Sequence, residues 1–214
     1  MAAAVDLYWL PLGAGGHSVR LNGRVFEAVS AHRQGRAASD LYHSALVVDL
    51  PASGRFVIEQ APAGRGRSGE RGVVGEGAVG ARWAGRTRIF RYEVRRWRDG
   101  VIPDVAEAVG SPRRLTDDPA TAELLWESVP EVPMPVWGRD ELQAGEMWNS
   151  NSVISWLIVR SGLAIESILP PAGGRAPGWN AGVVVARRMT GAEHVQPASG
   201  MRGDAAPDAT SPRR

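Results

Sequence analysis

Cysteine and lysine are both absent from this sequence of 214 residues, in which all 25 lysine-or-arginine positions are arginine. The absence of cysteine excludes disulfide bonds, thiolate zinc sites and a cysteine nucleophile. Long hydrophobic runs are also missing, because no apolar stretch approaches the roughly 18 residues that a membrane-spanning helix requires. The segment 1–6 lacks the basic and apolar regions of a signal peptide, so we expect a cytoplasmic protein.

Charge is nearly balanced, with a formal net charge of +2 at pH 7. So small an excess does not favour nucleic acid as a partner. Hydrophobic residues make up 43% of the chain, which is enough for a core, and the length fits one domain. We expect a single domain over 1–190 and a disordered tail over 191–214, where the chain becomes polar and aperiodic. The sequence does not indicate an oligomeric state.

Hydrophobic periodicity and turn residues predict an α+β fold in which a small antiparallel sheet packs on a helix. The expected strands are 5–11, 41–50, 55–60, 87–97 and 179–187. The second and third of these form a hairpin with a turn at 51–54. The expected helices are 24–33, 103–109, 117–128 and 152–161, the third with Asp118 and Pro119 suited to its first turn.

The predicted hairpin carries a histidine and a glutamate at matching ends. His43 opens its first strand and Glu59 ends its second, so we expect the two side chains to be cross-strand neighbours. A carboxylate beside an imidazole fixes the tautomer and stabilises the charged form, as a general base requires. The alternative is a structural histidine beside a surface glutamate.

Four small polar residues, Asn149 to Ser152, lead into the apolar helix predicted over 152–161. Such residues commonly cap a helix, which is one interpretation. The other is catalytic, because free backbone N–H groups at a helix N-terminus can hold an oxyanion and a hydroxyl there can act as a nucleophile. Serine is a weak nucleophile without a base, so this interpretation requires His43 within hydrogen-bonding reach.

Together the two segments resemble the permuted papain-like superfamily, in particular its lecithin:retinol acyltransferase and NlpC/P60-like branch. The resemblance covers roughly residues 40–62 and 148–162. It rests on the strand around His43, on the segment 57–62 and on the helix start. In the second of these, the family often has a histidine at the position that Glu59 occupies here. At the helix start, Asn149 is followed by Ser150, which stands where the family has its cysteine. The chain looks like a bacterial family in which serine replaces that cysteine.

The resemblance implies a hydrolase or acyltransferase that acts on an amide, ester or thioester. Ser150 would be the nucleophile, His43 the general base and Glu59 the orienting group, and Asn149 would assist the oxyanion. Ser152 is the fallback nucleophile. Because serine replaces the cysteine, the alternative is a catalytically inactive papain-like binding module for a peptide, lipid or cell-wall fragment. In either case we expect a small-molecule, lipid or peptide ligand.

The remaining motifs give weaker signals. Arginines interleaved with aromatic residues over 86–98 predict either a phosphate-binding surface or, as we prefer, a strand with a solvated arginine face. The pair Asp140 and Glu141 predicts a capped turn or a pocket lining. The four histidines show no metal-ligand spacing and no glycine-rich stretch matches a nucleotide-binding motif, so we expect no metal and no cofactor.

Overall fold

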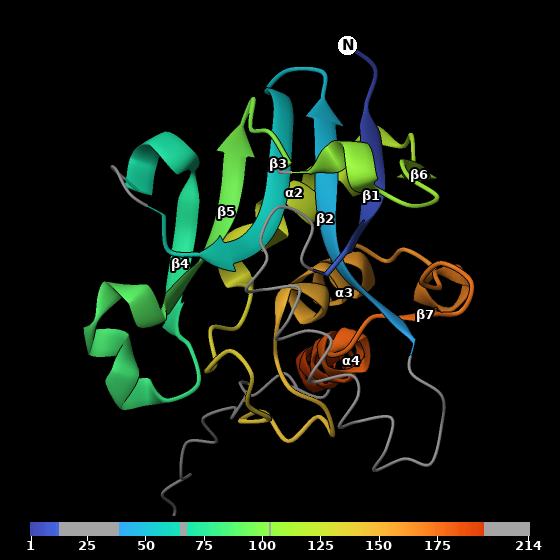
Figure 1. Cartoon of the computed structure of the whole chain (residues 1–214). Coiled ribbons are helices and arrows are strands. Elements are labelled where there is room, and N and C mark those ends of the chain that lie inside the picture. Colours follow the sequence, from blue (N-terminus) through green and yellow to red (C-terminus); the bar gives the residue numbers. More distant parts are fainter. Residues whose placement is uncertain (13–38, 65–67, 103, 195–214) are drawn as a thin grey trace, which may run out of the picture.

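A computed structural model describes residues 1–12, 39–64, 68–102 and 104–194 of the chain. These residues form an α+β fold with a mostly antiparallel sheet and three α-helices (Figure 1). The helix expected over 24–33 and most of the predicted tail lie outside the described residues. Among those that are described, no helix is long and apolar enough to cross a membrane.

The strands follow the order β4-β5-β3-β2-β1-β6, and all pairs along this path are antiparallel. A two-residue strand, β7, pairs in parallel with the start of β2. The strands are β1 (Ala4–Pro11), β2 (Asp40–Leu50), β3 (Gly54–Pro62), β4 (Val73–Ala78), β5 (Arg91–Arg98), β6 (Arg113–Thr116) and β7 (Gly174–Arg175).

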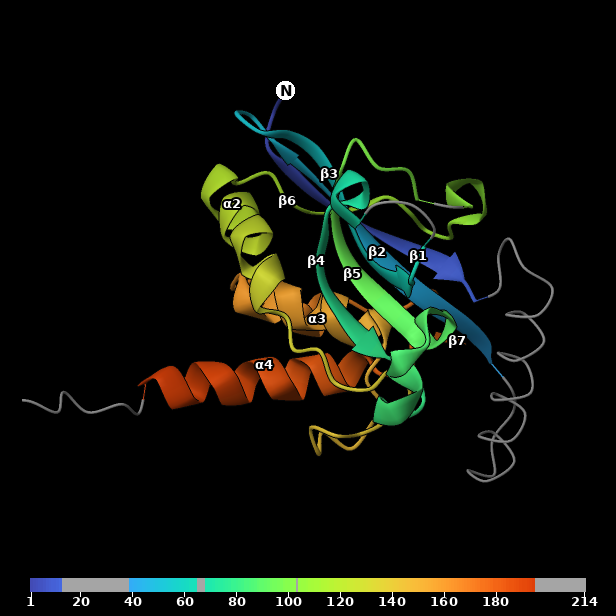
Figure 2. The ribbon, with the colours of Figure 1, turned by 90° about the vertical axis from the view of Figure 1, so that its left-hand side faces the viewer.

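Helices α2 (Pro119–Ser128), α3 (Ser150–Arg160) and α4 (Trp179–His194) lie on one side of the sheet (Figure 2). We call this side the helix face, and the large core cluster on it includes Leu7, Leu46 and Ile58. The other side, the outer face, carries a small cluster that includes Leu10 and Ala45, against which Ile102 packs. Both sheet faces are therefore buried around β1 and β2.

Short 3-10 helices interrupt the connections. They are η1 (Ser68–Arg71), η2 (Arg82–Arg86), η3 (Arg88–Phe90), η4 (Val105–Glu107), η5 (Val129–Glu131) and η6 (Ile165–Ser167). Two of them replace predicted structure: only η4 forms where a helix was expected over 103–109, and η3 precedes β5, which begins at Arg91 rather than at residue 87.

Local signals placed several elements correctly. The hairpin of β2 and β3 is confirmed, with a register in which Leu46 pairs with Ile58. The start of α2 is also confirmed: the Asp118 side chain accepts a 2.8 Å hydrogen bond from the backbone N–H of Thr121, and Pro119 occupies the first turn. Both depend on neighbours in sequence, which short-range patterns capture.

The strand predicted over 179–187 is wrong, because this segment forms α4. Its three consecutive valines indicated a strand, but the residues that it buries recur at helical spacing. The side of α4 that packs against α3 buries Ala181, Gly182, Val185 and Ala186. The burial of this apolar stripe outweighs the preference of valine for strands. The helix also continues past residue 190, where the predicted tail began.

Candidate functional site

The predicted nucleophile segment forms the first turn of α3. Asn149 is the N-cap residue, and its side-chain oxygen accepts hydrogen bonds from the backbone N–H groups of Asn151 at 2.9 Å and Ser152 at 3.4 Å. The Ser152 hydroxyl in turn accepts the Asn149 N–H at 3.0 Å. This reciprocal capping box binds N–H groups that an oxyanion would otherwise use.

Asn151, which the sequence reasoning did not single out, connects α3 to the sheet. Its side-chain oxygen accepts a 2.9 Å hydrogen bond from the hydroxyl of Ser44 in β2. Its amide group donates to the carbonyls of Tyr42 at 3.0 Å and Pro177 at 2.9 Å. A polar side chain at the start of an otherwise apolar helix was the available signal, because such a group requires partners once it is buried.

Ser152 and Ser155 connect α3 to the start of α4. The Ser152 hydroxyl donates a 2.7 Å hydrogen bond to the carbonyl of Gly178, and that of Ser155 donates at 2.7 Å to the carbonyl of Trp179. Gly178 has φ +82°, and a Cβ atom there would lie 2.6 Å from the Asn149 side-chain oxygen. Glycine is therefore required where this loop meets the N-cap of α3.

Ser150, the predicted nucleophile, is 7% exposed at the first position of α3. Within the described part of the chain its hydroxyl makes no hydrogen bond. Asn149, Ser150 and Ser152 thus lie together, as expected. Among the described residues, however, no imidazole or carboxylate accepts a hydrogen bond from their hydroxyl groups, and that of Ser152 donates to the carbonyls of Met147 and Gly178.

His43 lies on the outer face of the sheet. It pairs with Leu10, which belongs to the outer cluster, and its neighbour Ser44 points to α3 on the helix face. Because side chains alternate along a strand, the imidazole points away from α3. Burial lowers the pKa of His43 to about 4, against a smaller opposing effect of the Asp104 carboxylate, so the ring is neutral at pH 7.

Glu59 also lies on the outer face, but it is not the cross-strand neighbour of His43. The paired register of the hairpin ends where Leu46 lies opposite Ile58 and includes neither His43 nor Glu59, so that expectation is wrong. Instead Glu59 accepts a 3.0 Å hydrogen bond from the guanidinium of Arg95 in β5. Burial nevertheless raises the pKa of Glu59 above its ordinary value, despite the opposing effect of Arg95.

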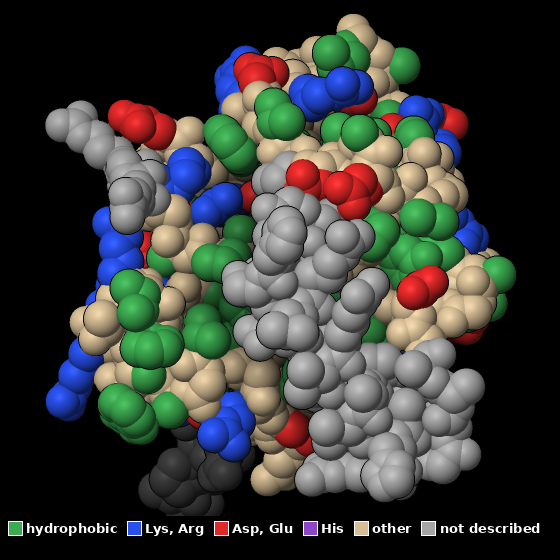
Figure 3. All heavy atoms as spheres, viewed as in Figure 1, with side chains coloured by type: hydrophobic (Ala, Val, Ile, Leu, Met, Phe, Trp, Pro, Cys, Tyr) green, Lys and Arg blue, Asp and Glu red, His purple; other side chains and the backbone are tan. Residues whose placement is uncertain are grey.

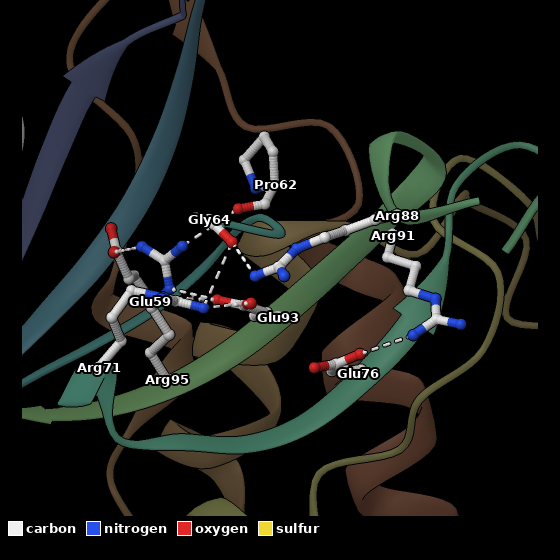
Figure 4. A network of polar contacts seen from close by, with 9 residues as sticks. All are labelled: Glu59, Pro62, Gly64, Arg71, Glu76, Arg88, Arg91, Glu93 and Arg95. Carbon is white, nitrogen blue, oxygen red and sulfur yellow. Dashed lines mark hydrogen bonds and ion pairs between the residues drawn. The ribbon is translucent and has the colours of Figure 1, made fainter. Parts of the chain in front are cut away.

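Glu59 belongs to a buried ion network on the outer face of β3 and β5 (Figure 4). Glu93 is fully buried, and it accepts hydrogen bonds from Arg95 at 3.0 Å and from Arg71 at 2.7 Å. Although burial raises the pKa of Glu93, its hydrogen bonds to Arg71 and Arg95 bring that pKa below the ordinary value. The network therefore holds two carboxylates and two guanidinium groups that neutralise one another.

The preferred interpretation of the arginine strand is also incorrect for part of β5. Arg95 is buried in the ion network, and Arg96 lies over the ring of Trp126 with 3.8 Å between the guanidinium carbon and the ring centroid. Arg96 also donates a 3.0 Å hydrogen bond to the carbonyl of Trp126. These arginines attach the strand to its surroundings instead of facing solvent.

A pocket of about 430 Å³ opens beside the start of α3. Pro177, whose carbonyl accepts hydrogen bonds from Asn149 and Asn151, forms part of its wall. The Glu146 carboxylate accepts a 2.9 Å hydrogen bond from the N–H of Gly178. The lining is partly apolar, with Ile165, Ile168, Pro170, Trp179 and Val183, and partly charged, with Glu146, Glu166, Arg175 and Arg187.

Other predicted features are structural. The Asp140 carboxylate accepts the N–H groups of Ala144 at 2.7 Å and Gly145 at 2.9 Å, so it caps a turn. Glu141 lines a second, smaller pocket and pairs with Arg82 at 2.8 Å. The described residues contain no cluster of three or more histidines or carboxylates able to hold a metal ion.

Comparison with protein families, with curated proteins and with solved structures found no match to this chain.

Proposed function

We propose that this chain is a papain-like domain that acts as a non-catalytic binding module and takes a short peptide. The observation that carries the proposal is the use of the polar residues at the start of α3. Asn149 and Ser152 cap the helix and join it to α4, while His43 points to the opposite side of the sheet. A serine whose hydroxyl has no base as hydrogen-bond partner among the described residues, at a helix end where the N–H groups of Asn151 and Ser152 are bound by the cap, is a poor nucleophile.

The pocket beside α3 supports peptide binding. Its volume of about 430 Å³ lies within the range of about 300–1,000 Å³ that small-ligand sites occupy. Its charged lining includes the carboxylates of Glu146 and Glu166 and the guanidinium group of Arg187, which pairs with Glu166, and its apolar wall includes Trp179. A short peptide with apolar side chains matches this lining, because it carries an ammonium group, a carboxylate and a hydrophobic body.

A fluorophosphonate probe tests the absence of catalysis. We expect no labelling of Ser150 or Ser152 in the wild-type protein under conditions that label a serine hydrolase run alongside. Ser150→Ala is the matched control for background labelling. Labelling that disappears in both Ser150→Ala and His43→Ala would establish the hydrolase or acyltransferase interpretation and overturn the proposal.

Titration with the dipeptide Leu-Leu, followed by calorimetry and by NMR chemical shifts, tests the pocket. We expect the zwitterionic dipeptide to bind and the same dipeptide with acetyl and amide blocking groups to bind at least fivefold more weakly. Glu146→Gln keeps an acceptor for Gly178 but removes the charge, so it should weaken binding about fivefold. Glu123→Gln, on the exposed side of α2, should change nothing. Equal binding of both dipeptides, or of neither, contradicts a peptide site here.

A further inference from the structure

The connection between β4 and β5 exposes large hydrophobic side chains. Trp83 in η2 is 76% exposed, and Ile89 and Phe90 in η3 are 77% and 45% exposed. The segment 77–92 contains four arginines, namely Arg82, Arg86, Arg88 and Arg91, and no acidic residue. Arg82 and Arg91 pair with Glu141 and Glu76, which lie outside this segment. We call residues 79–91 the β4–β5 knob.

The knob lies at a corner of the molecule beyond the ends of β4 and β5 (Figure 1). Figure 3 shows hydrophobic side chains gathered at this corner with arginine side chains along its border. An exposed apolar patch with a polar or charged rim is characteristic of an interaction site.

Hydrogen bonds hold the knob in this shape. The N–H of Val79 donates to the carbonyl of Phe90 at 2.8 Å, and the Arg91 side chain donates to the carbonyl of Gly85 at 2.5 Å. Arg82 forms two hydrogen bonds to the Glu141 carboxylate, at 2.8 and 2.9 Å, which tie η2 to the chain before α3. The exposure of Trp83 and Ile89 is therefore a property of an ordered segment.

From this arrangement we propose that the β4–β5 knob docks on the surface of an anionic lipid bilayer. Tryptophan favours the interface between headgroups and acyl chains, and Ile89 and Phe90 extend the surface that inserts there. Arginines beside them, such as Arg86, meet the negative charge of the headgroups. A fluid bilayer can take up a few protruding side chains without a preformed groove, so it suits the shape of this turn.

The alternatives fit this surface less well. A stable protein interface buries about 800 Å² on each partner, whereas three side chains on two short turns offer a much smaller area. Single-stranded RNA is bound by aromatic rings set along a basic groove, but Tyr92 is buried in the core and Arg95 and Arg96 of β5 are bound internally. The apolar tip also contains Ile89, which has no ring for a base to stack on.

Co-sedimentation of the full chain with vesicles tests the proposal. Vesicles of phosphatidylcholine with 30% phosphatidylglycerol should bind the protein at least tenfold more strongly than vesicles of pure phosphatidylcholine. The double variant Trp83→Ser, Ile89→Ser should lose about tenfold in affinity, because it removes the inserted side chains. Arg86→Glu should lose at least fivefold, and this loss should shrink at high salt.

Two matched controls separate the knob from general charge and hydrophobicity. Arg98→Glu changes the net charge equally but lies at the other end of β5, and Leu124→Ser removes an exposed leucine from α2. Both should bind the anionic vesicles like the wild type, and circular dichroism should show all variants folded. Loss of binding in the controls as large as in the knob variants would overturn the proposal. So would binding of poly(U) RNA or equal binding to neutral vesicles in place of the expected preference.

Discussion

The hydroxyl of Ser44 lies 2.9 Å from the side-chain oxygen of Asn151, and this buried hydrogen bond joins β2 to α3 across 107 positions of the chain. Asn151→Ala removes this bond and the two that the Asn151 amide donates to the carbonyls of Tyr42 and Pro177. Because buried groups that lose their partners cost about 1–3 kcal/mol, we expect the free energy of unfolding to fall by about 3 kcal/mol. Chemical denaturation measures it.

The contribution of the Ser44 bond itself follows from a double-mutant cycle. Ser44→Ala should cost about 1 kcal/mol, since a single neutral hydrogen bond is lost. The double variant should cost less than the sum of the two single variants, by at least about 0.5 kcal/mol. Strict additivity would show that this contact does not stabilise the junction.

The packing of α4 on α3 depends on Gly182. A Cβ atom at this position would lie 2.0 Å from the carbonyl oxygen of Ser152 and 2.2 Å from the hydroxyl oxygen of Ser155. We therefore expect Gly182→Ala to lower the free energy of unfolding by about 1–3 kcal/mol, as overpacking does. Gly191→Ala in the same helix meets no atom within 4 Å and should instead stabilise by up to about 1 kcal/mol. Thermal and chemical unfolding of the pair decide whether close helix contact is the cause.

The fully buried carboxylate of Glu93 stabilises the two arginines that contact it. Glu93→Gln leaves Arg71 and Arg95 with one counter-charge fewer in a buried site, and we expect a loss of about 3–5 kcal/mol. Glu76→Gln is the control, because the 3.4 Å pair of Glu76 with Arg91 is largely exposed and should contribute under about 0.5 kcal/mol. Similar losses in the two variants would contradict the importance of burial.

Stability should depend on pH through His43. Its pKa is about 4 in the folded protein and 6.5 in a free side chain, so between these values the unfolded chain binds a proton that the folded protein does not. Acidification from pH 6.5 to pH 4 therefore destabilises the wild type, by up to about 3 kcal/mol from this group. His43→Gln lacks the group, so its unfolding free energy should fall less over the same range. Parallel curves for wild type and variant would show that His43 does not cause the dependence.

The parts of the structure that depend on neighbouring residues could be predicted from the sequence. The hairpin of β2 and β3, the Asp118 cap and the polar start of α3 each carry a short-range signal, and each is present. α4 could not be recognised, because its valines favour a strand and only packing against α3 decides for the helix. The strands β4 and β6 carry little apolar pattern and depend on their partners in the sheet.

The arrangement of the candidate site was beyond prediction for a different reason. A shift of one residue in strand register exchanges the two faces of a sheet. The sequence therefore did not show whether His43 or its neighbour Ser44 faces α3. The partner of Glu59 was equally hidden, because Arg95 is 36 residues away and meets it only through the pairing of β3 with β5.

One consequence of the β2 alternation concerns redesign. Since adjacent side chains of this strand point in opposite directions, the double substitution His43→Ser, Ser44→His would move the imidazole to the helix face, where α3 packs. The alternation of side chains along this single strand therefore decides whether the imidazole lies on the outer face or on the side of Asn151, in the first turn of α3.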